Sequence, residues 1–208
     1  MPELFIYDEI GPDYWGLVSA KTILSELEPI DDASEIVVRI NSPGGDVNEA
    51  LAIYNALNRR AGRTIVEIDA LAASAASYIA MAGDEIRIAE NAMMMIHNAW
   101  TIALGDADEL RKIADTLDKY TGTIAKAYAA RSGLTVDDVT ELMSDETWFT
   151  AEEAVGSGFA DSVGQPLKVA ANLRPGVFKR QPDGLQSEHR PNYSQSLRQR
   201  ELRLLKIR

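Results

Sequence analysis

An alternation of short β-branched runs with helical segments constrains the fold of this chain more than any other feature. Apolar runs that predict strands recur between segments whose apolar residues fall at helical spacing. The predicted strands are residues 3–7, 35–40, 64–68, 85–88 and 93–96, and the predicted helices are 15–27, 46–57, 75–82, 106–131 and 150–156. Strands alternating with helices favour a parallel sheet with crossover helices. We therefore expect an α/β fold with a parallel-rich sheet and one long helix.

Capping patterns place the starts of several of these helices. Asp46 is followed three residues later by Glu49, and Asp106 is followed by Glu109. An acidic or hydroxyl residue with Glu three positions later is typical of a capping box at a helix N-terminus. Leu110, Ile113, Ala114, Leu117, Ile124 and Tyr128 form the apolar stripe expected along the longest helix.

The charge distribution divides the chain into two parts. The 208 residues carry 32 acidic and 21 basic side chains, for a net charge of −11. Residues 165–208 hold ten of the basic residues and only three of the acids, so this tail is +7 and residues 1–164 are −18. The tail also holds four prolines and little periodic apolar pattern. We expect residues 1–164 to form the folded domain and residues 165–208 to be a basic, flexible tail.

The composition excludes several classes of function. The chain has no cysteine, which removes thiol nucleophiles, disulfides and thiolate metal sites. It has two histidines, so we expect no metal site and no cofactor. An acidic domain is a poor partner for nucleic acid, and no apolar stretch is long enough to span a membrane. The N-terminus does not resemble a signal peptide, and we expect a cytoplasmic protein.

Two turns that follow predicted strands could carry chemistry. The glycine turn, Asn41–Gly45, lies between a strand and a helix, and its exposed amides could bind an anion or an oxyanion. A plain tight turn is the alternative. Ser74 lies at the next strand-to-helix junction, where a hydroxyl could act as a nucleophile or could simply cap the helix. Ser77 shares this ambiguity but lies one turn further in, where burial against the helix is expected.

A histidine and two acids complete the candidate groups. His97 ends an apolar strand and is the one histidine of residues 1–164, so any serine mechanism with a histidine base must use it. It could also be an ordinary core histidine. Asp145 and Glu146 precede the aromatic pair Trp148-Phe149 and could orient an imidazole, although acids before a helix are usually solvated caps.

Together, these segments resemble the proteolytic subunit of the Clp protease (ClpP), a serine peptidase with a crotonase-like fold. The resemblance covers roughly residues 3–163. It rests on Ile40–Gly45 (INSPGG), on Ala72-Ala73-Ser74 followed by Gly83, on Met95-Ile96-His97, and on Thr150–Val155 (TAEEAV) followed by Gly158-Phe159-Ala160-Asp161. These four segments stand in the family's order and near its spacing.

The resemblance implies the roles of the site residues. Ser74 would be the nucleophile, His97 the general base, and the amides of Gly44 and Ala75 the oxyanion donors. The family's usual third member is an Asp, and an alignment without a gap places Glu146 there, with Asp145 one residue earlier. Ala75-Ala76 also stand where the family usually has Met-Gly.

The resemblance also implies an assembly and a substrate class. The long helix corresponds to the family's handle, which implies a homo-oligomeric ring of seven, single or stacked. The chain begins close to its first strand and ends in a basic tail, which resembles compact ClpP-like chains of tailed phages and prophages. Those are taken to be head-maturation (prohead) proteases that cleave capsid or scaffold precursors without ATP.

Three alternatives stay open at this point. The chain could be a bacterial ClpP-type subunit that works with an unfoldase. It could be a crotonase-like acyl-CoA enzyme, or a catalytically silent scaffold in head assembly.

Overall fold

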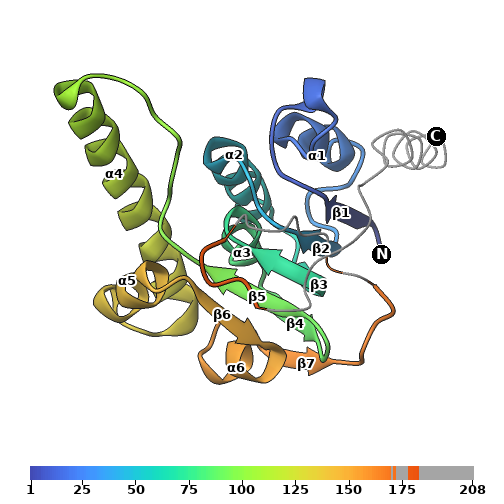
Figure 1. The fold of residues 1–208 in the computed structure, drawn as a ribbon. Coiled ribbons are helices and arrows are strands. Elements are labelled where there is room, and N and C mark those ends of the chain that lie inside the picture. The colour runs from blue at the N-terminus through green and yellow to red at the C-terminus, as the bar shows by residue number, and fades with distance from the viewer. Residues whose placement is uncertain (170, 172–177, 183–208) are drawn as a thin grey trace.

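The computed structural model describes residues 1–169, 171 and 178–182, and within these residues the chain folds around one mostly parallel sheet (Figure 1). Its strands are β1 (Glu3–Tyr7), β2 (Ile36–Ser42), β3 (Thr64–Ala73), β4 (Glu85–Ala89), β5 (Met93–Ile96), β6 (Thr147–Thr150) and β7 (Ser162–Gly164). The main path runs β1-β2-β3-β4-β7, all parallel. β5 pairs in parallel with the end of β3, and β6 pairs antiparallel with β5. The predicted α/β class with a parallel-rich sheet is confirmed.

Six α-helices accompany the sheet in the described residues, and Figure 1 shows α1 and α2 side by side, α3 next to α2 and the central strands, and α4 projecting away from the sheet. They are α1 (Ala20–Leu27), α2 (Val47–Asn58), α3 (Ala75–Ala80), α4 (Ala107–Ser132), α5 (Val136–Ser144) and α6 (Ala151–Gly156). Within the described ranges, no helix is both long and apolar enough to cross a membrane.

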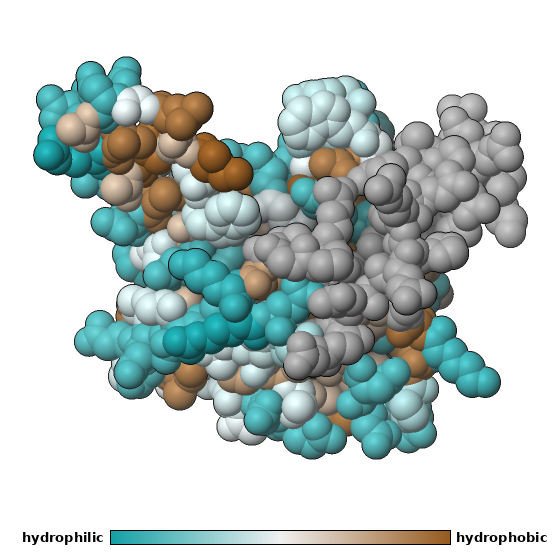
Figure 2. All heavy atoms as spheres, viewed as in Figure 1, coloured by the Kyte–Doolittle hydropathy of each residue, from teal (hydrophilic) through white to brown (hydrophobic). Residues whose placement is uncertain are grey.

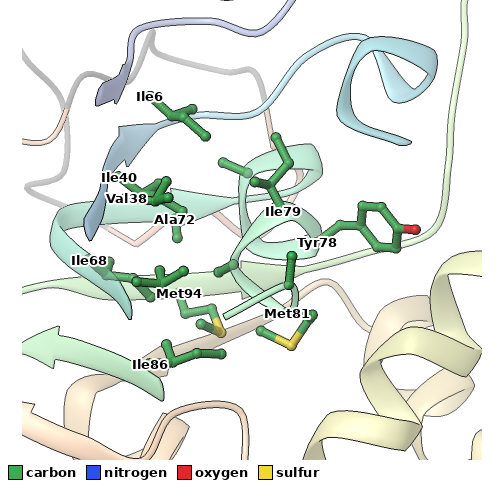
Figure 3. Packing of buried hydrophobic residues seen from close by; sticks show 14 of the residues in the cluster. Ile6, Val38, Ile40, Ile68, Ala72, Tyr78, Ile79, Met81, Ile86 and Met94 are labelled. Carbon is green, nitrogen blue, oxygen red and sulfur yellow. The ribbon is translucent and has the colours of Figure 1, made fainter. Parts of the chain in front are cut away.

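The hydrophobic core lies between the central strands and α3 (Figure 3). Ile40, Ile68 and Met94 are almost fully buried on the face of the sheet that α3 covers (Figure 3). The small residues of β3 and α3 permit close approach, because alanine adds little volume between strand and helix. The core therefore holds the end of β3 and the start of α3 in a fixed position.

Several predicted boundaries were wrong, and each has a local cause. The predicted helix 15–27 begins only at Ala20, because Gly16 adopts a left-handed conformation after a short turn and Ser19 caps α1. The strand predicted to end at residue 68 continues to Ala73. β6 was missed, although its Thr-Trp-Phe-Thr sequence is typical of a strand.

The helix caps were predicted more accurately than the helix faces. Asp46 caps α2, but Glu49 accepts a hydrogen bond from the Ala20 amide at 2.6 Å instead of closing a capping box. The capping box between Asp106 and Glu109 is confirmed. The apolar stripe of α4 is buried only in its second half, at Ile124 and neighbouring positions, whereas its first half faces solvent.

Candidate active site

Ser74 occupies a strained turn between β3 and α3. Its backbone has φ 55° and ψ −125°, a conformation that costs a non-glycine residue about 1–3 kcal/mol. The Ser74 side chain forms no capping hydrogen bond with α3, so the capping role considered from the sequence is not what the structure shows. Instead, Ser74 Oγ lies 2.7 Å from His97 Nε2. The turn therefore directs the hydroxyl toward the imidazole.

The pairing of β3 with β5 brings His97 to this turn. Ala73 is the partner of Met95 in the parallel ladder, and the Ser74 amide donates to the Met95 carbonyl at 2.9 Å. His97 lies just beyond β5. Burial lowers the pKa of His97, the charge of Glu146 raises it, and the charge of Lys179 lowers it, with burial the largest effect. The imidazole is therefore mainly neutral near pH 7 and able to accept a proton.

Ser77 is buried beneath the Ser74 turn, as expected. Its Oγ lies 2.7 Å from the carbonyl oxygens of Ser74 and Met95 and 2.8 Å from the Tyr128 hydroxyl. These contacts join α3, β5 and α4 at one point. Ser77 thus supports the position of Ser74, and its hydroxyl is not exposed to a substrate.

The glycine turn lies directly against the Ser74 turn. Gly44 has φ 92°, and a Cβ at this position would stand 2.6 Å from the Ala73 carbonyl oxygen and 2.8 Å from the Ala75 nitrogen. Only glycine permits both this conformation and this approach. Ala75 contributes the first amide of α3, a position without an intrahelical acceptor. The Gly44 amide donates to Ser42 Oγ at 3.1 Å, so it would have to exchange that partner to bind an oxyanion.

Glu146 and Asp145 have different surroundings. Glu146 has φ 52° and is buried, and its Oε2 and Oε1 accept the amides of Lys179 and Arg180 at 2.9 and 2.5 Å. Among the described residues, the hydrogen bonds of Glu146 go to Trp148, Lys179 and Arg180 and not to His97. Asp145 is exposed and lies 3.2 Å from the Arg180 guanidinium. Of the two acids, Glu146 is the one whose charge acts on His97.

Two hollows meet at Ser74. The first lies between α3 and α4, and its lining includes Ser74, Tyr78, His97, Leu117 and Tyr128. The second borders the glycine turn, and its lining includes Ile10, Trp15, Gly44, Ser74 and Phe178. An extended peptide could therefore reach the hydroxyl from either side. No group of three or more His, Asp or Glu side chains suited to a metal ion occurs among the residues that the structure describes.

One part of the site, the segment 178–182, was not predicted from the sequence. Phe178 is only 7% exposed, and its ring packs edge-on against those of His97 and Trp148, with centroids 5.5 and 5.6 Å away. A phenylalanine in a mainly polar tail was the available signal. The domain boundary at residue 164 and the flexibility of the tail stay predictions, and most of residues 165–208 lie outside the described ranges.

Comparisons with known proteins identify relatives. The family model described as Clp protease matches residues 3–166. An ATP-dependent Clp protease proteolytic subunit of Pleurastrum terricola is 33% identical over 147 residues, covering 68% of this chain and 74% of its own length. Proteolytic subunit 1 of Leifsonia xyli is 26% identical over 170 residues, covering 81% and 85%. Subunit 3 of Streptomyces coelicolor is 29% identical over 168 residues, covering 78% and 76%.

Proposed function

Because the chain belongs to the Clp protease family, we propose that it is a serine endopeptidase, with Ser74 as nucleophile and His97 as general base. The observation that carries this proposal is the 2.7 Å contact between Ser74 Oγ and His97 Nε2 at a strained turn. A nucleophile within hydrogen-bond reach of a mainly neutral imidazole is the arrangement that acyl transfer requires. The same contact favours an active enzyme over a silent scaffold, and a serine peptidase over an acyl-CoA enzyme.

In this mechanism, Ser74 Oγ attacks the peptide carbonyl while His97 Nε2 takes its proton. The amides of Ala75 and Gly44 stabilise the oxyanion, and the Gly44 amide leaves Ser42 Oγ to do so. His97 then gives its proton to the leaving amine, and water hydrolyses the acyl-enzyme by the reverse sequence. The negative charge of Glu146 stabilises the imidazolium that forms in both steps, which is the role of the third member of a triad.

For the biological role, we propose an ATP-independent head-maturation protease of phage or prophage type, acting on capsid or scaffold precursors. Its support is the basic tail of an otherwise acidic chain. The relatives are ATP-dependent Clp protease proteolytic subunits by name, which favours the alternative, a subunit that works with an unfoldase. Digestion of a folded precursor without ATP would support the first role, and digestion only with an added Clp ATPase and ATP would support the second. A cytoplasmic location stays a prediction.

An oligomeric ring, with seven subunits, is part of the proposal. Exposed apolar side chains gather over the first half of α4 and the loop before it, and Figure 2 shows this patch in brown at the upper left. They include Trp100, Ile102, Leu104 and Leu110. An apolar patch of this kind marks an interaction site. Native mass spectrometry should give a heptamer or a multiple of it, and a monomer at micromolar concentration would contradict the proposal.

The catalytic proposal is tested by hydrolysis of fluorogenic peptides. Ser74→Ala and His97→Ala should each lower the rate of hydrolysis by at least about 10⁴-fold. The two groups act together, so the removal of either one abolishes most of the catalysis. Ser25→Ala is the matched control, since Ser25 is an exposed serine of α1. Hydrolysis by Ser74→Ala at the rate of the unmodified protein would refute the proposal.

A further inference from the structure

The segment 178–182 lies on the active site rather than beside it. Figure 1 draws it in red near α3 and β5, and its ring contacts place Phe178 between His97 and Trp148. Phe178 is buried as deeply as many core residues. It also joins Ser74 and Gly44 in lining the second hollow. A residue outside the matched family segment, 3–166, thus occupies space next to the catalytic pair.

The backbone of the same segment binds the proposed catalytic acid. The Lys179 and Arg180 amides donate to the two carboxylate oxygens of Glu146, so each oxygen has a tail partner. Consecutive amides that converge on one carboxylate form a concave anion site. The Arg180 guanidinium also pairs with Asp145. Both acids of the sequence prediction are therefore held by the tail.

These contacts change the surroundings of His97. The Phe178 ring covers part of the imidazole, and the positive charge of Lys179 opposes its protonation. An imidazolium must form during acyl transfer, and Glu146 is the group that stabilises it. With the carboxylate bound to tail amides and a lysine nearby, the imidazolium is less favourable. The described tail residues thus work against the step that the rest of the site promotes.

We propose that His97, Glu146 and Trp148 form a binding site for an aromatic-basic-basic peptide segment, and that Phe178-Lys179-Arg180 occupies it in cis as an autoinhibitory contact. The proposal rests on the proposed function. Activity then requires the segment to leave, which frees both carboxylate oxygens of Glu146 from the tail amides and opens the second hollow. A substrate or partner segment of the same chemistry competes for the site.

Variants of the full chain test this contact. Phe178→Ala removes the aromatic anchor and leaves the catalytic groups intact. Arg180→Pro removes the amide that donates to Glu146 Oε1, whereas Arg180→Ala keeps this amide and removes only the guanidinium. Lys168→Ala is the control, because it removes an exposed positive charge of the tail that lines neither hollow. Circular dichroism checks that each variant folds.

Two readouts separate the inference from the proposed function. The first is the rate of fluorophosphonate labelling of Ser74. It should rise about tenfold in Phe178→Ala and Arg180→Pro. This is the increase expected if the state without the bound segment is populated about one-tenth of the time and then becomes dominant. It should rise less in Arg180→Ala and stay unchanged in Lys168→Ala. The second is the pKa of His97 by NMR, which should rise in Phe178→Ala as Lys179 moves away.

A synthetic peptide with the sequence of residues 177–182 provides the complementary test. Added to Phe178→Ala, it should return the labelling rate toward that of the unmodified protein. An unchanged labelling rate and an unchanged His97 pKa in Phe178→Ala would overturn the inference while leaving the serine mechanism intact. If neither the unmodified protein nor any variant is labelled, the serine mechanism is refuted. The proposed tail contact is then also refuted only if the pKa of His97 is the same in Phe178→Ala as in the unmodified protein.

Discussion

Replacement of Gly44 by alanine tests how closely the glycine turn must approach Ser74. The new Cβ would lie 2.6 Å from the Ala73 carbonyl oxygen, about 1 Å inside the roughly 3.5 Å optimum for such contacts. The turn must therefore move by an appreciable fraction of an ångström relative to Ser74 and Ala75. Alanine at φ 92° adds a backbone cost of about 1–3 kcal/mol.

The expected consequences are measurable separately. A displacement of about 1 Å in a catalytic group costs roughly 10²-fold in rate, so kcat for peptide hydrolysis should fall by about that factor in Gly44→Ala. Thermal or urea unfolding should show a loss of about 1–3 kcal/mol. Both assays use the purified full chain, and the hydrolysis is measured well below the unfolding temperature.

Gly156→Ala is the matched control for Gly44→Ala. Gly156 ends α6, and a Cβ there would meet nothing within 4 Å. This variant should keep its rate and its stability or gain up to about 1 kcal/mol, because alanine favours helix over glycine. A folded Gly44→Ala enzyme with an unchanged rate would refute the reasoning that the glycine turn supplies an oxyanion donor.

Two further predictions concern the pH dependence of hydrolysis and the stability of the fold. The kcat/KM should rise with pH and reach half its maximum below pH 6.5, because burial lowers the pKa of His97 from that ordinary value and the neutral imidazole is the base. Lys179→Ala should move this midpoint up and Glu146→Gln should move it down, and shifts of the same sign would contradict the assignment. Arg39→Met should destabilise the fold by about 3 kcal/mol, because it leaves the buried carboxylate of Asp69 without its cation. The rate of peptide hydrolysis at 25 °C should not change. An unchanged unfolding midpoint would contradict this prediction.

The sequence predicted the fold class from the alternation of strands and helices, and the pair Ser74 and His97 from the family resemblance and from His97 being the one histidine of residues 1–164. Ala73 and Met95 are partners in adjacent parallel strands, so the residues that follow them must lie close together. The glycine turn was predicted from its Pro-Gly-Gly sequence after a strand, and the structure places it beside Ser74 because Ser42 pairs with Ala72 at the end of β2. Topology thus determines most of the candidate site.

Other features depend on geometry that a residue pattern does not encode. Nothing in Ala73-Ser74-Ala75 indicates the positive φ of Ser74, because this conformation is uncommon for residues other than glycine, and serine is a favoured helix cap. The burial of Phe178 depends on a contact with Trp148 across 30 residues of chain. The stripe along α4 has helical spacing throughout, yet only its second half meets the core. The Ser74 conformation, the burial of Phe178 and the half-buried stripe of α4 therefore depend on tertiary contacts rather than on the local preferences of the residues.

The central claim is that Ser74 is the nucleophile, and mass spectrometry of a fluorophosphonate adduct tests it most directly. The unmodified protein should gain one adduct per chain, located on the peptide that contains Ser74. Ser74→Ala should gain none, and Ser77→Ala should still label at Ser74, because the Ser77 hydroxyl is buried in contacts with the Ser74 and Met95 carbonyls. An adduct that persists in Ser74→Ala at full stoichiometry, or that maps to Ser77, would contradict the account.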